Sequence, residues 1–76
     1  MVRLLIWKGD LLLADRAEAD ESTAVRVIDA WLTEIHQGNH GAGTFEIDAW
    51  FCDATLRFQR PLATVRGVVH PANRSA

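Results

Sequence analysis

The sequence predicts an α+β fold: a two-layer sandwich in which one amphipathic helix packs on a mainly antiparallel sheet, in the order β(β)αββ(β). Apolar residues recur at intervals of three and four between residues 22 and 37, which is typical of one helical face. Between residues 45 and 51 apolar and polar residues alternate, as in a strand with one buried face. The 76 residues suffice for one hydrophobic core, so we expect a single domain over 1–76 with a frayed tail over 71–76.

The helix is expected from Ser22 to Gln37. Ser22 is the expected N-cap, and Gly38 suits the left-handed conformation that often ends a helix. Trp31 falls on the apolar stripe and is therefore predicted to be a core residue. The whole stripe consists of Ala24, Val27, Ile28, Trp31, Leu32 and Ile35, opposite a polar face of Arg26, Asp29, Thr33 and Glu34.

Two strands are predicted before the helix, over 3–7 and 11–16. Gly9 suits the first central position of a tight hairpin turn between them. The pairs that follow from such a turn are Trp7 with Leu12 and Ile6 with Leu13. A single long, bent strand over the same residues is the alternative.

The strand after the helix is predicted to bury Phe45, Ile47, Ala49 and Phe51. A turn at Asp53-Ala54 would lead into a strand containing Leu56 and Phe58. The expected pairs are Phe51 with Leu56, Ala49 with Phe58, and Trp50 with Arg57 on the outer face. Pro61 is then expected to break this strand, and Ala63 to His70 to form a last short one with a bulge at Gly67.

Composition points to an ordinary globular protein of a reducing compartment. Apolar residues make up 49% of the chain and charged residues 24%. The lone Cys52 has no intramolecular disulfide partner, and the apolar run near Met1 is too short for a signal peptide or a membrane span. We therefore expect a cytoplasmic protein.

Charge is unevenly distributed along the chain. The net charge is −2, and acidic residues dominate the first half. After Asp53 the charged residues are all basic: Arg57, Arg60, Arg66 and Arg74. This is either ordinary surface charge or a two-signed molecule whose acidic surface meets a basic partner.

Neither metal binding nor catalysis is predicted. His36 and His40 have a spacing found in zinc sites, and Cys52 with His70 would complete four ligands, but the second close ligand pair is missing. The charge of Asp53 disfavours a Cys52 thiolate. The glycine-rich loop from Gly38 leaves a helix C-terminus, whereas phosphate cradles lead into a helix N-terminus. The carboxylates Glu46 and Asp48 have no expected pocket, so we predict no metal, no cofactor and no enzyme.

The predicted function is that of a non-enzymatic protein-binding module, a small inhibitor or regulator that occludes a larger protein or complex, including one that handles nucleic acid. Exposed tryptophan beside arginine is typical of binding hot spots, and acidic side chains can compete for a basic groove. The expected contact residues are Trp50, Arg57 and Arg60 on the sheet, or Asp15, Glu18, Asp20 and Glu21 in the acidic stretch. Inhibitors from phages and mobile elements, including anti-CRISPR proteins, have this size and layout, an analogy that involves no shared motif.

Two alternatives remain from the sequence. A nucleic-acid-binding regulator would use the C-terminal arginines with Trp50 and Phe58 as stacking platforms, although the isoelectric point of about 5.8 disfavours it. A homodimer would form a small-ligand or catalytic pocket between its protomers. The outward positions of Trp7 and Trp50 fit either a binding surface or a dimer that covers them.

Overall fold

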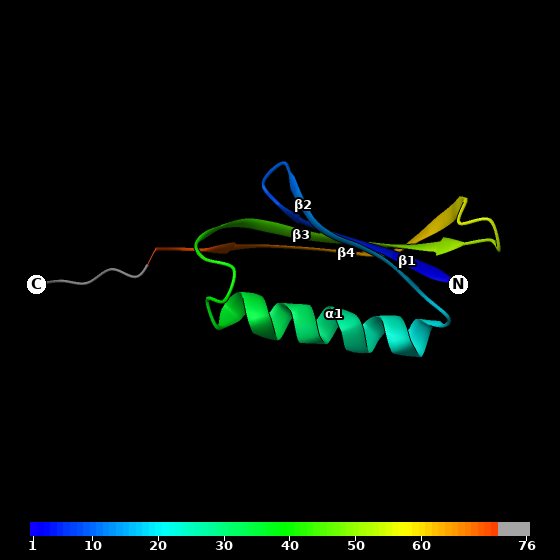
Figure 1. Ribbon diagram of the computed structural model, residues 1–76, viewed down its shortest axis with the longest axis horizontal. Coiled ribbons are helices and arrows are strands. Elements are labelled where there is room, and N and C mark those ends of the chain that lie inside the picture. Colours follow the sequence, from blue (N-terminus) through cyan, green and yellow to red (C-terminus); the bar gives the residue numbers. More distant parts are fainter. Residues whose placement is uncertain (72–76) are drawn as a thin grey trace, which may run out of the picture.

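The computed structural model describes residues 1–71, so all but the first residue of the expected tail at 71–76 lies outside the described residues. It confirms the α+β class: one helix lies along one face of a four-stranded antiparallel sheet (Figure 1). The strands lie side by side in the order β2-β1-β3-β4. The elements are β1 (Val2–Lys8), β2 (Leu11–Glu18), α1 (Glu21–His36), β3 (Gly43–Cys52) and β4 (Phe58–Val69).

The first two strands form the predicted hairpin, so the alternative of one long strand is wrong. Gly9 has a φ of 58° at the first turn position, a conformation that glycine adopts without steric cost. Trp7 pairs with Leu12 as predicted. The prediction that Ile6 faces Leu13 is wrong, because the register shifts at this point and Ile6 pairs with Ala14. The extra residue allows Leu13 to pack against the core.

The helix begins one residue earlier than expected, and its N-cap is Asp20 rather than Ser22. The Asp20 carboxylate accepts a hydrogen bond of 2.7 Å from the Thr23 amide, and its negative charge suits the positive end of the helix dipole. At the other end Gly38 has a φ of 80°, which confirms the predicted left-handed termination.

The core lies between α1 and the inner face of β1 and β3. Alternate residues of the two central strands point toward the helix, as the period of a strand requires. Trp31 packs at the margin of this core and is only partly buried, and its ring stacks on His40 with centroids 5.0 Å apart. The buried hydrophobic residues are Val2, Leu4, Ile6, Ala24, Ile28, Ile35, Phe45, Ile47, Ala49 and Cys52.

The predicted register between the last two strands is wrong. A loop over 53–57 replaces the expected two-residue turn, because the Asp53 carboxylate accepts hydrogen bonds from the backbone amides of Thr55 and Arg57. The strand therefore resumes later than expected. The observed pairs are Cys52 with Phe58, Phe51 with Arg60, Trp50 with Pro61, and Ala49 with Ala63.

Pro61 does not break β4 as predicted. The strand runs continuously from Phe58 to Val69, because it lies at the edge of the sheet, where a residue without an amide hydrogen is tolerated. The irregularities lie opposite Trp50 and Cys52, near the proline. The expected bulge at Gly67 is absent, and Gly67 pairs regularly with Phe45.

None of the helices in residues 1–71 combines the length and the apolar composition needed to cross a membrane.

Candidate functional site

The face of the sheet opposite α1, which we call the open face, is covered by no other element of residues 1–71 (Figure 1). The residues that alternate with the core positions point toward this side. On the two central strands they are Arg3, Leu5 and Trp7 of β1 and Glu46, Asp48 and Trp50 of β3.

An aromatic cluster occupies one end of the open face. The rings of Trp50 and Phe58 are stacked, with centroids 5.1 Å apart and an interplanar angle of 30°. The Arg3 guanidinium carbon lies 5.3 Å from the Phe58 centroid, within the range of a cation–π contact. Phe58 is 42% exposed, so an apolar surface remains accessible here.

The arginine of this cluster is fixed by a bidentate ion pair across β1 and β2. Arg3 Nε donates to Asp15 Oδ1 at 2.9 Å, and Arg3 Nη2 donates to Asp15 Oδ2 at 2.6 Å. These hydrogen bonds hold the pKa of the Asp15 carboxyl below its usual value. The pair therefore orients the guanidinium toward Phe58 without adding a net charge to the face.

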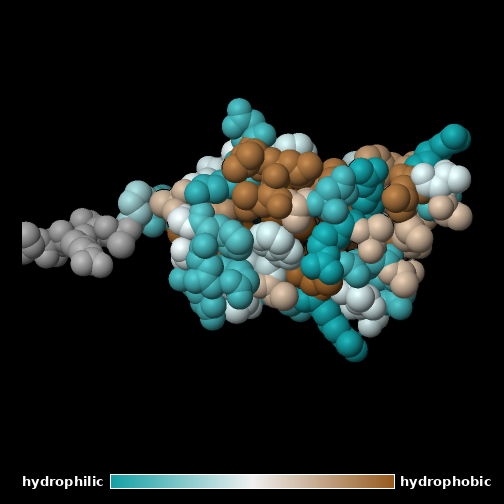
Figure 2. Space-filling model, viewed as in Figure 1, coloured by the Kyte–Doolittle hydropathy of each residue, from teal (hydrophilic) through white to brown (hydrophobic). Residues whose placement is uncertain are grey.

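The other end of the open face carries aliphatic surface. Trp7 is partly buried against its cross-strand neighbour Leu12, which is 40% exposed, whereas Leu11, also exposed, pairs with Lys8 and lies on the helix side of the hairpin. Figure 2 shows apolar surface gathered over the β1–β2 hairpin that holds these leucines. Exposed apolar patches of this kind mark interaction sites more often than isolated exposed leucines do.

Two carboxylates of β3, Glu46 and Asp48, lie on the open face between β1 and β4. Arg66 Nε donates to Glu46 Oε1, and this bond lowers the pKa of the Glu46 carboxyl. Asp48 accepts a 3.3 Å hydrogen bond from the Thr64 hydroxyl. Partial burial, and then the neighbouring Glu46, raise the pKa of Asp48. Arg66 is thus bonded to Glu46, and Asp48 is bonded to Thr64.

The structure does not bring the three predicted sheet residues together. Trp50 lies on the open face, whereas the Arg60 guanidinium carbon lies 4.1 Å from the Phe51 ring centroid on the helix side. Arg57 lies in the loop before β4 and is exposed. The expected pairing of Trp50 with Arg57 is wrong, and Phe58 takes that place on the indole ring.

The four predicted acidic residues likewise have different structural roles. Asp15 pairs with Arg3, and Glu18 Oε1 accepts a 3.0 Å hydrogen bond from Arg16. Asp20 caps α1, and Glu21 is in its first turn. These contacts leave no single acidic patch built from all four.

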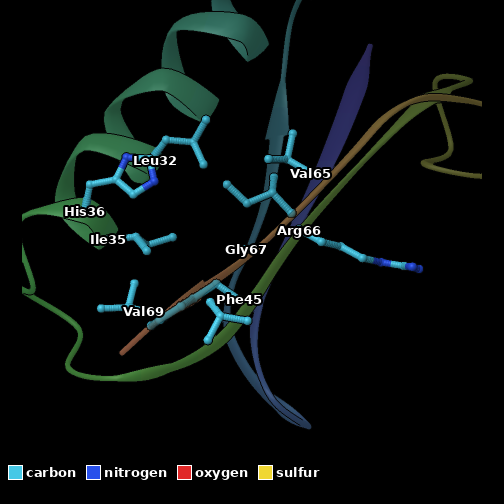
Figure 3. Close-up of a pocket in the computed structure, with 10 residues that line it drawn as sticks. Leu32, Ile35, His36, Phe45, Val65, Arg66, Gly67 and Val69 are labelled. Atoms are coloured by element: carbon cyan, nitrogen blue, oxygen red, sulfur yellow. The ribbon is translucent and has the colours of Figure 1, made fainter. Parts of the chain in front are cut away.

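A hollow lies on the helix side of the sheet, between the C-terminal half of α1 and β4, with a volume of about 290 Å³. In Figure 3, Leu32 and Ile35 face Val65 and Val69 across it, whereas Arg66 points away toward the open face. It forms because α1 lies over β1 and β2 and leaves the inner side of β4 less covered. We call it the β4 groove.

The remaining candidates have structural explanations. Cys52 is buried, and its Sγ lies 3.6 Å from the Trp50 carbonyl oxygen. Lys8 Nζ donates to the His40 carbonyl at 2.7 Å and so anchors the glycine-rich loop. Residues 1–71 contain no group of three or more side chains placed to hold a metal ion.

The arginines of the nucleic-acid alternative are dispersed over the described part of the chain. Arg60 is on the helix side, Arg57 is in the loop, and Arg66 is paired with Glu46. Arg74 lies outside the described residues.

Sequence reasoning did not single out Arg3, Leu5 and Leu12 as site residues. A signal was present, because period-two alternation along β1 gives both faces of this strand apolar residues. The contact of Arg3 with Phe58 depends on the order of strands in the sheet, which periodicity does not supply.

Comparisons with protein-family models, with curated proteins and with solved structures find no match to this chain.

Proposed function

We propose that this protein is a non-enzymatic protein-binding module that contacts its partner through the open face of its sheet. The observation that carries the proposal is the uncovered cluster of Trp50, Phe58 and Arg3 at one end of that face, continued by Trp7 and Leu12 at the other. Tryptophan, aromatic and arginine side chains are enriched among the residues that supply most of the binding energy at protein interfaces.

The electrostatics of the face fit a protein surface better than a nucleic-acid backbone. Its arginines, Arg3 and Arg66, are both neutralised by carboxylates on neighbouring strands. A nucleic-acid site needs unpaired cations that can replace counterions on phosphates. An apolar centre with internally paired charges instead matches a protein interface, in which charged residues are depleted from the core.

Preorganisation supports the same proposal. The stacked rings and the bidentate Arg3–Asp15 pair hold their side chains in place before any partner arrives. Binding then loses less side-chain entropy than it would with free rotamers. Partner inhibition or regulation is the role that we assign to such a rigid, uncovered face.

A pull-down with substitutions on each side of the molecule tests the proposal. The tagged full chain serves as bait in lysate with and without nuclease, and captured proteins are identified by mass spectrometry. Phe58→Asp and Leu12→Asp each place a charge on the open face. Val25→Asp is the matched control, because Val25 is exposed to a similar extent, 45%, and belongs to α1 rather than to the open face.

We expect a stoichiometric protein that is retained by wild type and Val25→Asp and is lost from both open-face variants. Binding of the purified partner should weaken by about 30-fold or more, as for the loss of a hot spot. Thermal unfolding of each variant shows that it is folded. Equal capture by all four baits would contradict the assignment of the face, and capture that disappears after nuclease treatment would favour the nucleic-acid alternative.

A further inference from the structure

The outer edge of β4 differs along its length in how well it is protected against pairing with another strand. The half nearest the β3–β4 loop carries Pro61, and the two register shifts lie opposite this half. Proline and irregular pairing are devices by which edge strands avoid association. From Ala63 to Val69 the ladder with β3 is regular, and neither device is present.

This unguarded half also lacks net charge and is rich in strand-forming residues. The segment reads Ala-Thr-Val-Arg-Gly-Val-Val, and its single charge, Arg66, is paired with Glu46. Val68 is 58% exposed beside it. A regular, weakly charged edge strand is a template for another strand.

We propose that a second copy of this chain pairs with the 63–69 edge of β4 about a two-fold axis. Antiparallel pairing of β4 with its copy continues the alternation of the sheet and keeps both helices on the same face. The product is a continuous eight-stranded sheet with the two β4 grooves adjacent beneath its centre.

Side-chain alternation restricts the register of this pairing. Paired residues must lie on the same face, so the two-fold axis must pass through a residue rather than between two residues. An axis at Arg66 would place two guanidinium groups opposite each other, which is unfavourable. An axis at Val65 places Arg66 of one copy opposite Thr64 of the other.

Charge complementarity favours the axis at Val65. Thr64 is paired with and hydrogen-bonded to Asp48 within its own sheet, whereas Arg66 is hydrogen-bonded to Glu46. With this axis, four side chains form one row across the open faces of the two copies. The row runs from Glu46 and Arg66 of one copy to Thr64 and Asp48 of the other. The partner's guanidinium then approaches the carboxylate that lacks an arginine of its own in the single chain.

With the axis at Val65, residues 63–67 of one copy pair with residues 67–63 of the other, and this five-residue interface is short, about 17 Å at the rise of a β-strand. Interfaces of this size belong to the weak or transient class. The measurement therefore follows the sedimentation of the full chain over a concentration range from about 1 µM to 1 mM.

Thr64→Arg is the decisive variant. The new side chain lies beside Asp48 within its own sheet, so the folded monomer is retained, but it faces Arg66 of the second copy. We expect dimer formation to weaken by about tenfold or more. The double variant Thr64→Arg, Arg66→Thr exchanges the two side chains. It recreates the row in reversed order and should therefore restore association.

Thr33→Arg is the control, because it adds the same charge on the outer side of α1. Dimer formation should be unchanged in this variant.

Hydrogen exchange provides a readout that needs no variant. Amides of residues 63–67 that point outward should exchange about tenfold more slowly at high than at low concentration. A monodisperse wild-type monomer over the whole range would overturn the proposal. Association that is insensitive to Thr64→Arg, or is not restored by the exchange variant, would also overturn it by placing the contact elsewhere.

Discussion

Asp53 determines the path of the chain between β3 and β4 through its carboxylate. Oδ1 accepts hydrogen bonds from the Thr55 amide, the Thr55 hydroxyl and the Arg57 amide, at 2.9, 2.7 and 3.0 Å. Oδ2 accepts one from Gln59 at 3.2 Å. Together these bonds, led by the Thr55 hydroxyl, lower the pKa of Asp53.

The lowered pKa gives this carboxylate a defined contribution to acid unfolding. A group whose folded-state pKa lies below its unfolded value stabilises the protein above that unfolded value, 3.8, and loses this contribution as the pH falls through the folded value. We expect the free energy of unfolding to fall less steeply between about pH 4 and pH 2 in Asp53→Asn than in wild type. Urea unfolding at several pH values measures the slope.

Asp29→Asn is the matched control for this prediction, because Asp29 lies on the exposed face of α1 and its carboxylate accepts no hydrogen bond within residues 1–71. Its slope should equal that of wild type. A wild-type slope in Asp53→Asn would mean that the loop does not depend on the ionised carboxylate.

Single residues also show where sequence reasoning succeeds and where it fails. The hairpin turn at Gly9 was predictable, because only a few residue types adopt a positive φ there at little cost. The loop at Asp53 was not, because a side chain that accepts several backbone hydrogen bonds leaves no trace in hydrophobic periodicity.

Among the elements, α1 has its capping residue at a position that a substitution can verify. Ser22 and Asp20 are both good N-cap residues by type, and the sequence alone did not choose correctly between them. Asp20→Ala should lower the melting temperature, because the Thr23 amide loses its acceptor, whereas Ser22→Ala should change it little. Circular dichroism melts of the two variants measure the difference.

Asp20→Asn provides the control, since it keeps an acceptor oxygen while removing the charge. Its melting temperature should lie between those of wild type and Asp20→Ala. Equal melting temperatures for Asp20→Ala and Ser22→Ala would contradict the observed cap.

The strand β4 was divided by the sequence prediction and is continuous in the structure. Pro61 is a valid strand breaker only in the interior of a sheet, and edge or interior position depends on strand order. Periodicity likewise placed Trp31 on the apolar face of α1 but did not indicate that its ring stacks on His40 at the margin of the core.

For the whole molecule, the fold class and the ββαββ order followed from periodicity and turn residues, while the candidate site did not. The predicted residues Trp50 and Arg60 are close in sequence, yet they lie on opposite sides of the sheet. The cluster that the structure assembles joins Arg3 of β1 to Phe58 of β4, through their common neighbour β3. Residue composition indicated a binding surface of aromatic and arginine side chains, and the order of the strands determined which of these side chains meet on it.

The adjacency of β1 and β3 has a consequence for the speed of folding. Ile6 of β1 pairs with Ile47 of β3, and β2 and α1 lie between these two residues in the sequence. The hairpins β1–β2 and β3–β4, by contrast, join strands that follow each other directly along the chain. Hairpins form in about 1–10 µs, and joining two of them over a long intervening segment is slower because loop closure comes before the stabilising contacts. Docking of the two hairpins along the β1–β3 seam is thus the expected barrier.

Stopped-flow refolding distinguishes this route from one that begins elsewhere. Ile6→Val, at the seam, should mainly slow folding, whereas Val69→Ala, at the far end of β4, should mainly speed unfolding. If both variants act only on unfolding, the seam forms after the barrier. In the expected case, the pairing that builds the core also sets how long the chain exposes its apolar strands during each folding event.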